Sequence, residues 1–181
     1  MAFDAHEVAL WILSEAKNHD ILISHMKLQK LLYYAQASFI AMTGEPLFHN
    51  SIFAWQHGPV VPDLYRSFSK FGSSAIHDVE DVAPPVRFKP FIDNLLKDKG
   101  RLSAHELRNL SHNEDTWYQA WANPVSHEIT IGSIDSCCSP SFWTSDEEDD
   151  FQPTFSSAAD EDKFFRDNIK DDEINAILAS R

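Results

Sequence analysis

Nine histidines are the residues of this chain that most directly suggest a metal site or acid–base catalysis. His105 and His112 lie seven residues apart, about two turns of a helix, and the other seven are scattered along the chain. The sequence contains no HExxH motif and no CxxC pair, the spacings that typically supply zinc ligands. We therefore predict no metal site and no cofactor, and we interpret the histidines as surface or core-edge residues.

Nucleophilic catalysis also lacks a recognisable set of residues. Cys137 and Cys138 are adjacent, and the sequence places no base beside either thiol. The chain has only five glycines and contains neither a nucleophile elbow nor a phosphate-binding loop. The acidic run Asp146–Asp150 lacks the central glycine and the spaced glutamate of a calcium loop. These patterns favour a protein that is not an enzyme.

The elements that must position any site are mostly helical. Asp4 is placed to cap a first helix, and Ser24 is placed to cap a second one. Gly44 follows the second helix where a left-handed residue is favoured. An apolar stripe at helical spacing predicts the buried side of that second helix: it comprises Leu28, Leu31, Leu32, Ala35, Phe39 and Met42.

A small β element is predicted next. Ile52–Trp55 is short, apolar and β-prone, and Gly58-Pro59 is expected to break this strand. We expect Gly58 to adopt a positive φ or to approach another part of the backbone closely. Pro62 suits the first turn of the following helix, because its missing N–H needs no partner there. Ile129–Ile131 is a candidate second strand that would pair with the first.

The later part of the chain predicts shorter helices and an acidic end. Helices are expected from Pro90, after Ser103, which forms a capping box with Glu106, and after Asp115 as a cap. Leu107 and Leu110 are expected to face inward. We predict one compact, mainly α domain over residues 1–138, with a minor β-hairpin or short antiparallel sheet, and an acidic extension with a terminal helix over residues 139–181.

Composition and charge limit the classes of partner. Of 181 residues, 43% are hydrophobic, enough for one core, and no apolar run is long enough to cross a bilayer. The start of the chain lacks the basic region of a secretory signal, and two adjacent cysteines are typical of reduced cytoplasmic proteins. The net charge is −13, and residues 141–181 hold 12 acidic and four basic side chains. We expect a cytoplasmic protein that binds neither membranes nor nucleic acid.

A partner-binding surface is predicted beside the apolar stripe of the second helix. Gln29, Tyr33 and Gln36 lie on a band away from this stripe, and tyrosines are typical of interfaces. The candidate surface is completed by residues of the β element and the helix after it: Trp55, His57, Pro59, Val60 and Tyr65. The alternative is that Trp55 and Tyr65 only pack the hairpin against the helix.

Three segments of this chain resemble one known family. They are Lys27–Gln36 (KLQKLLYYAQ), Trp55–Tyr65 (WQHGPVVPDLY) and Leu110–Trp117 (LSHNEDTW). Their order and sequence are similar to those of the Panacea domain of SocA-like antitoxins and phage-associated GepA-like proteins, over Ser24 to about Ala122. In the third segment Ser111 stands where the family often has threonine, and Thr116 where it often has proline.

The resemblance implies a small, mainly helical antitoxin whose partner is a toxin encoded nearby, neutralised mostly by direct binding. In the SocA-like case the antitoxin also presents the toxin to a protease, so an AAA+ protease is a second implied partner. Gly58, Pro62, His112 and Trp117 belong to the matching motifs as structural residues, and His112 is expected to hydrogen-bond a backbone turn. Two alternatives remain open: a phage or mobile-element enzyme with a cryptic hydrolytic site around His57, His112 and Glu114, and a transcriptional co-regulator.

Overall fold

A computed structural model describes residues 2–137 of the chain, with side chains through Ile134. The chain divides into two units, Met1–Phe142 and Trp143–Arg181, and the description that follows concerns the first. The predicted acidic extension over residues 139–181, its terminal helix and the run Asp146–Asp150 lie outside the described residues. The boundary at residue 138 therefore stays a prediction.

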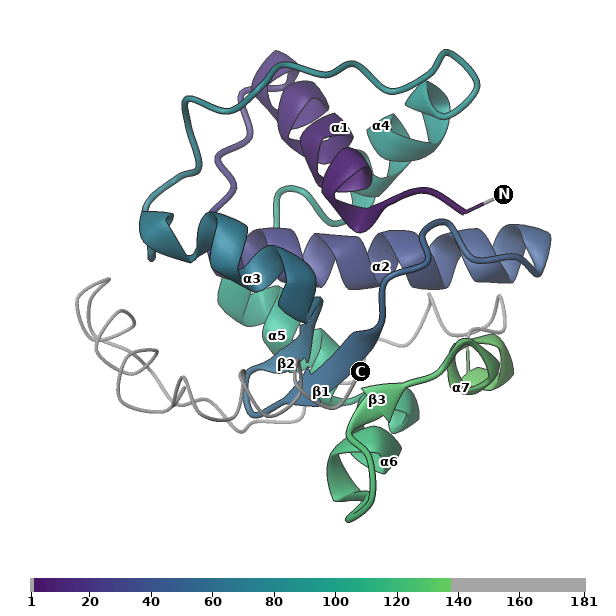
Figure 1. Ribbon diagram of the computed structural model, residues 1–181. Coiled ribbons are helices and arrows are strands. Elements are labelled where there is room, and N and C mark those ends of the chain that lie inside the picture. Colours follow the sequence, from purple (N-terminus) through teal and green to yellow (C-terminus); the bar gives the residue numbers. More distant parts are fainter. Residues whose placement is uncertain (1, 138–181) are drawn as a thin grey trace. The chain divides into compact units, whose positions relative to one another are not determined.

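The described chain is mainly helical with one small sheet, as predicted (Figure 1). The helices are α1 (Ala5–Asn18), α2 (His25–Thr43), α3 (Pro62–Phe68), the 3-10 helix η1 (Ser69–Phe71), α4 (Lys89–Asp98), α5 (Ala104–His112), α6 (Asp115–Ala122) and α7 (Ile131–Cys137). The strands are β1 (Ile52–Trp55), β2 (Gly58–Val60) and β3 (Glu128–Ile129). Helix α7 was not predicted.

Local capping signals account for where several helices begin and end. The Asp4 side chain accepts a hydrogen bond from His6 N, and Ser103 with Glu106 forms a complete capping box at α5. Gly44 ends α2 with a φ of 71°. The prediction for Asp115 is wrong by one residue, because Glu114 is the N-cap of α6 and its side chain makes no capping hydrogen bond.

The sheet has the order β2-β1-β3 and is antiparallel throughout. Phe53 pairs with Val60 on one side of β1 and with Glu128 on the other. Gly58-Pro59 does not break the β element as predicted: it opens β2, an edge strand where a proline removes no ladder hydrogen bond. The predicted pairing of a later strand with β1 is confirmed, although that strand ends at Ile129 and Ile131 starts α7.

Helix α2 lies at the centre of the described chain. It contacts α1 and α4 on one side and α5, β2 and α7 on the other (Figure 1). Every residue from His25 to Ala37 is therefore buried, whatever its polarity. The sequence pattern had predicted one buried face and one exposed face for this helix, and that prediction is wrong.

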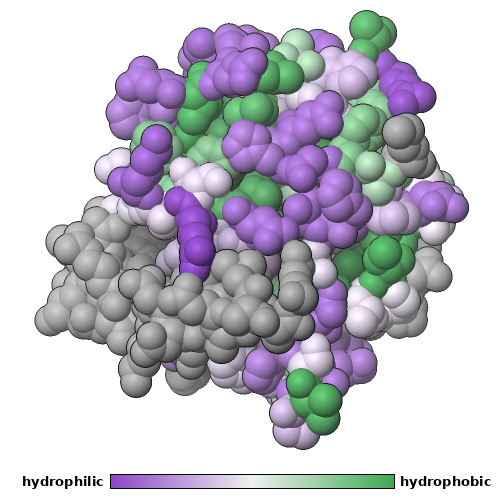
Figure 2. Space-filling view, viewed as in Figure 1, coloured by the Kyte–Doolittle hydropathy of each residue, from purple (hydrophilic) through white to green (hydrophobic). Residues whose placement is uncertain are grey.

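Two further burial predictions are wrong at the ends of helices. Met42, in the last turn of α2, is 71% exposed, and Leu110 of α5 is 41% exposed. Other exposed apolar residues are scattered over separate elements, and hydrophilic residues dominate the upper part of the face seen in Figure 2. Scattered apolar residues of this kind are ordinary on a protein surface. No helix within residues 2–137 combines the length and the apolar character needed to cross a membrane.

Candidate functional site

Two glutamines of α2 hold the backbone of the segments that pack on it. Gln29 Oε1 accepts a hydrogen bond from Val61 N at 2.8 Å, which fixes the end of the hairpin. Gln36 Oε1 accepts from Leu47 N and Phe48 N, and Gln36 Nε2 donates to Phe48 O. Both side chains are 2% exposed. They satisfy buried backbone groups, so the expectation that they lie on an exposed band is wrong.

Tyr33 connects α2 to the start of α6. Its ring is fully buried, and its hydroxyl donates a hydrogen bond to Glu114 Oε2 across 81 positions of sequence. Burial raises the pKa of the Glu114 carboxyl to about 7, although the hydrogen bond from Tyr33 acts in the opposite direction. Tyr33 is thus part of an internal polar pair, and the prediction that it lies on an exposed band is wrong.

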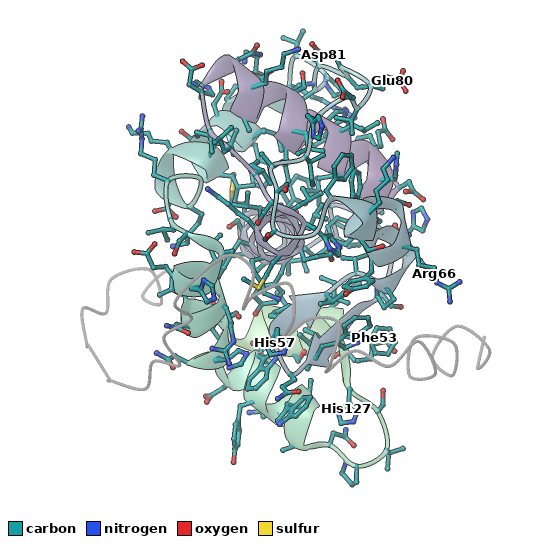
Figure 3. All side chains as sticks on the ribbon, turned by 90° about the vertical axis from the view of Figure 1, so that its left-hand side faces the viewer. Phe53, His57, Arg66, Glu80, Asp81 and His127 are labelled. Atoms are coloured by element: carbon teal, nitrogen blue, oxygen red, sulfur yellow. The ribbon has the colours of Figure 1, made fainter. Side chains whose placement is uncertain are left out.

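An aromatic cluster lies where β1 meets α3. Phe53 and Trp55 point to the same face of β1 and are half-buried. The rings of Trp55 and Tyr65 are 5.1 Å apart, and the ring of His25 lies 4.6 Å from that of Tyr65. Figure 3 labels Phe53 on β1 and shows the exposed Arg66 of α3 extending outward from the chain. We call Phe53, Trp55 and Tyr65 the aromatic face.

Trp117 of α6 contacts both the aromatic face and α5. Its indole Nε1 donates to Trp55 O at 3.1 Å, and its ring stacks on His112 with centroids 3.8 Å apart. His112 was expected to hydrogen-bond a backbone turn. Its Nε2 is buried and has no hydrogen-bond partner among the residues that the structure describes. The motif histidine therefore acts here through stacking on Trp117.

A group of basic side chains meets between α2, β2 and α5. Lys30 is 1% exposed, and its Nζ donates to Pro59 O at 2.9 Å. Gly58, with a φ of 89°, leaves room for this ammonium: a Cβ on Gly58 would lie 3.0 Å from Lys30 Nζ and 2.8 Å from Ser111 Oγ. The predicted positive φ of Gly58 is confirmed, and the groups that approach Gly58 closely are the side chains of Lys30 and Ser111 instead of another part of the backbone. Pro62 begins α3, as predicted.

Three side chains complete this group: His57, Arg108 and His112. Burial lowers the pKa of His57 and of His112 to about 3, and the positive charges of Arg108 and Lys30 act in the same direction. Burial, then the charge of Arg108, brings the pKa of Lys30 well below its usual value. We call Lys30, His57, Arg108 and His112 the basic cluster; Figure 3 shows His57 at the opposite end of the described chain from Glu80 and Asp81.

The hydrolytic alternative required His57, His112 and Glu114 to act together. The charges of Arg108 and Lys30 lower the pKa of both His57 and His112. The Glu114 carboxylate instead accepts the Tyr33 hydroxyl, and the charge that acts on it most is that of Lys99. A carboxylate held in this way does not orient a histidine as a general base.

The predicted partner-binding residues thus fall into two groups. Six are buried: Gln29, Tyr33, Gln36, His57, Pro59 and Val60. Trp55 and Tyr65 are half-buried, and their rings pack together while remaining partly accessible. Of the predicted set, these two are the residues that a protein partner can reach on the folded chain.

Sequence reasoning missed Lys30, Arg108 and Phe53 as members of these clusters. One signal for Lys30 was present, since the segment from Met26 to Ala37 contains too few charged residues for a surface helix. No comparable local signal marks Arg108, because its neighbours come from other elements of the fold. Phe53 was identified only as part of a strand.

A separate set of possible metal ligands lies between α1 and α4. One oxygen or nitrogen atom from each of Glu15, His19 and Asp93 falls within 4.8 Å of the others. Lys89 Nζ, however, already forms ion pairs with both Glu15 and Asp93, and His19 pairs with Asp93 at 3.2 Å. This arrangement is complete as an ion-pair network without a metal.

Comparison with known proteins identifies the family. Residues 28–118 match the family model described as antitoxin SocA-like, Panacea domain. The chain is also 34% identical over 144 residues to the protein named Antitoxin SocA of Caulobacter vibrioides (strain NA1000 / CB15N), a match that spans 71% of this chain and 76% of that protein. No solved structure matches the chain significantly. The matched residues run from α2 to the first half of α6 and hold the basic cluster, the aromatic face and the Tyr33–Glu114 pair, and the chain belongs to the SocA-like antitoxin family that the Panacea domain defines.

Proposed function

We propose that this chain is an antitoxin that neutralises a cognate toxin by binding it directly. The observation that carries the proposal is the 34% identity to a protein named as an antitoxin, over more than two thirds of both chains. In a bacterial or phage genome the toxin would be encoded next to this chain. Inhibition would be steric and would require no catalytic step by the antitoxin.

The aromatic face is the surface that we propose for toxin binding. Tryptophan and tyrosine supply large contact areas with little loss of side-chain entropy, and they dominate the energetics of many interfaces. Trp55 and Tyr65 combine partial accessibility with support for their rings, since the two rings pack on each other and His25 packs on Tyr65. A supported ring loses little freedom on binding. Arg66 at the edge of the face offers an exposed positive charge.

A growth-rescue experiment tests the proposal. The neighbouring gene is expressed alone, where we expect growth arrest, and then together with the full chain, where we expect rescue. Trp55→Ala and Tyr65→Ala should each weaken toxin binding by about tenfold or more, the loss typical of an interface hot spot. Tyr118→Ala is the matched control, because Tyr118 is 62% exposed on α6 and lies outside the proposed face.

Three outcomes decide between mechanisms. Rescue by the wild type with loss of binding in Trp55→Ala supports direct occlusion through the aromatic face. If toxin levels recover when the host lacks its AAA+ protease, the antitoxin also acts as a proteolytic adaptor. If no neighbouring product is toxic, or the two proteins do not bind, the antitoxin proposal fails.

A further inference from the structure

Two residues of the basic cluster have no acidic side chain paired with them among the residues that the structure describes. Arg108 carries a positive charge beside the buried amine of Lys30, in a site assembled from α2 and α5, and no carboxylate of residues 2–134 forms an ion pair with either one. The charge of Arg108 also lowers the pKa of both His57 and His112. Proteins almost always pair charges that they bury, so this site departs from the usual arrangement.

The cluster also contains buried polar atoms whose hydrogen-bonding capacity is unsatisfied within the described residues. Arg108 Nε and His112 Nε2 are buried from solvent and have no hydrogen-bond partner among the described residues; Arg108 Nε is a donor, and His112 Nε2 is a donor in the tautomer that carries its proton there. Lys30 Nζ can donate more than one hydrogen bond, and Pro59 O is its acceptor among those residues. Arg108 and His112 are themselves only half-buried, so the cluster borders on the surface of α5.

We infer that the basic cluster is a binding site for a single carboxylate group of a protein ligand. Arg108 would hold the carboxylate at the surface of α5, His112 would supply a second donor in the tautomer that carries its proton on Nε2, and the Lys30 amine lies buried behind them. Gly58 is required for this arrangement, because a side chain at that position would displace Lys30 Nζ. This inference rests on the proposed function, because the carboxylate would be supplied by an Asp or Glu side chain of the toxin.

Two observations favour a protein carboxylate over a phosphate. The chain carries a net charge of −13, which repels polyanions such as nucleic acid before they reach a local basic site. The cluster is also joined to the proposed toxin-binding surface, since His112 stacks on Trp117 and Trp117 binds Trp55 O. A partner seated on the aromatic face could therefore place an acidic side chain at α5.

An anion titration of the full chain tests the site without the toxin. Sodium acetate is titrated at constant ionic strength while the ring signals of His57 and His112 are followed by NMR, and acetamide serves as the neutral isostere. We expect saturable shifts of both rings with acetate and none with acetamide. Arg108→Gln should weaken acetate binding by about tenfold or more, the usual loss for a charged hydrogen bond, whereas Arg108→Lys should retain part of it.

Lys97→Gln is the matched control, because Lys97 is an exposed cation on α4, away from the cluster. It should bind acetate as the wild type does. Absence of saturable shifts in the wild type would overturn the inference, and so would equal weakening in Lys97→Gln. Inorganic phosphate that binds more tightly than acetate would overturn the choice of carboxylate. A negative titration together with successful growth rescue would remove this site and leave the antitoxin proposal intact.

Discussion

Glu114 should make the stability of this protein rise as the pH falls from neutrality, the opposite of what an ordinary surface carboxylate does. The carboxyl is 4% exposed at the N-cap of α6, where it accepts a hydrogen bond from the buried Tyr33. Burial raises its pKa from 4.5 to about 7. Between those two values the folded state holds a proton that the unfolded state has lost.

The sign and the size of the effect follow from this difference in proton binding. A raised pKa of a carboxyl contributes stability that is fully present below the unfolded value of 4.5 and is lost as the pH rises through about 7. Integration over this window with the two pKa values gives a gain of about 2 kcal/mol between roughly pH 7.5 and pH 5.5. Buried histidines with lowered pKa values act in the opposite direction, so the total change does not isolate Glu114.

Comparison with Glu114→Gln removes that complication. Glutamine keeps an oxygen that can accept the Tyr33 hydroxyl, but it does not titrate. The free energy of unfolding is measured by urea denaturation at both pH values for the wild type and for the variant. The change on acidification should be more favourable in the wild type by about 2 kcal/mol. The histidine contributions cancel in this double difference because both proteins retain those residues.

Glu45→Gln is the control, since Glu45 is exposed after α2 and its side chain lies outside every cluster described above. That variant should follow the pH dependence of the wild type. If Glu114→Gln and the wild type changed by the same amount between the two pH values, the carboxyl would titrate alike in the folded and unfolded states. The physical account of the Tyr33–Glu114 pair would then be wrong.

The remaining predictions concern the backbone and the buried polar residues. Gly58→Ala should lower the free energy of unfolding by ~1–3 kcal/mol more than Gly44→Ala, because both glycines have a positive φ but nothing lies within 4 Å of a Cβ at Gly44; equal losses in denaturant melts would contradict the predicted clash. Gln36→Leu should cost ~1–3 kcal/mol by leaving backbone groups of the α2–β1 connection unpaired, and unchanged amide exchange at Phe48 would count against it. Tyr33→Ala should lower stability by ~3–5 kcal/mol, and any weaker toxin binding should follow from unfolding, which a binding assay on the folded fraction separates from a contact effect.

Local signals were sufficient for much of the fold. The capping residues Asp4, Ser24 and Ser103 predicted where helices begin, because a side chain that bonds a free N–H acts within three residues of sequence. Gly44 and Gly58 predicted positive φ for the same reason, since backbone sterics depend on the residue itself. The motifs of three segments also sufficed to indicate the family.

The position of α2 was decided by the tertiary structure alone. Helical periodicity shows that one side of a helix is apolar, but it does not show how many neighbours the helix has. Because α2 is covered on several sides, Gln29 and Gln36 face backbone groups instead of solvent. The prediction that Gln29, Tyr33 and Gln36 lie on an exposed band is wrong for that reason, and of the predicted partner-binding residues only Trp55 and Tyr65 are not buried.

The side-chain clusters that form the candidate sites also could not be predicted from the sequence. Tyr33 meets Glu114 across 81 positions, and Lys30 meets Pro59 across 29. Their altered pKa values arise from burial and from charges on other elements, neither of which exists until the chain has folded. Local sequence signals predicted most of the helices, several of their caps and the family of this protein. The packing around α2 decided which polar residues are internal.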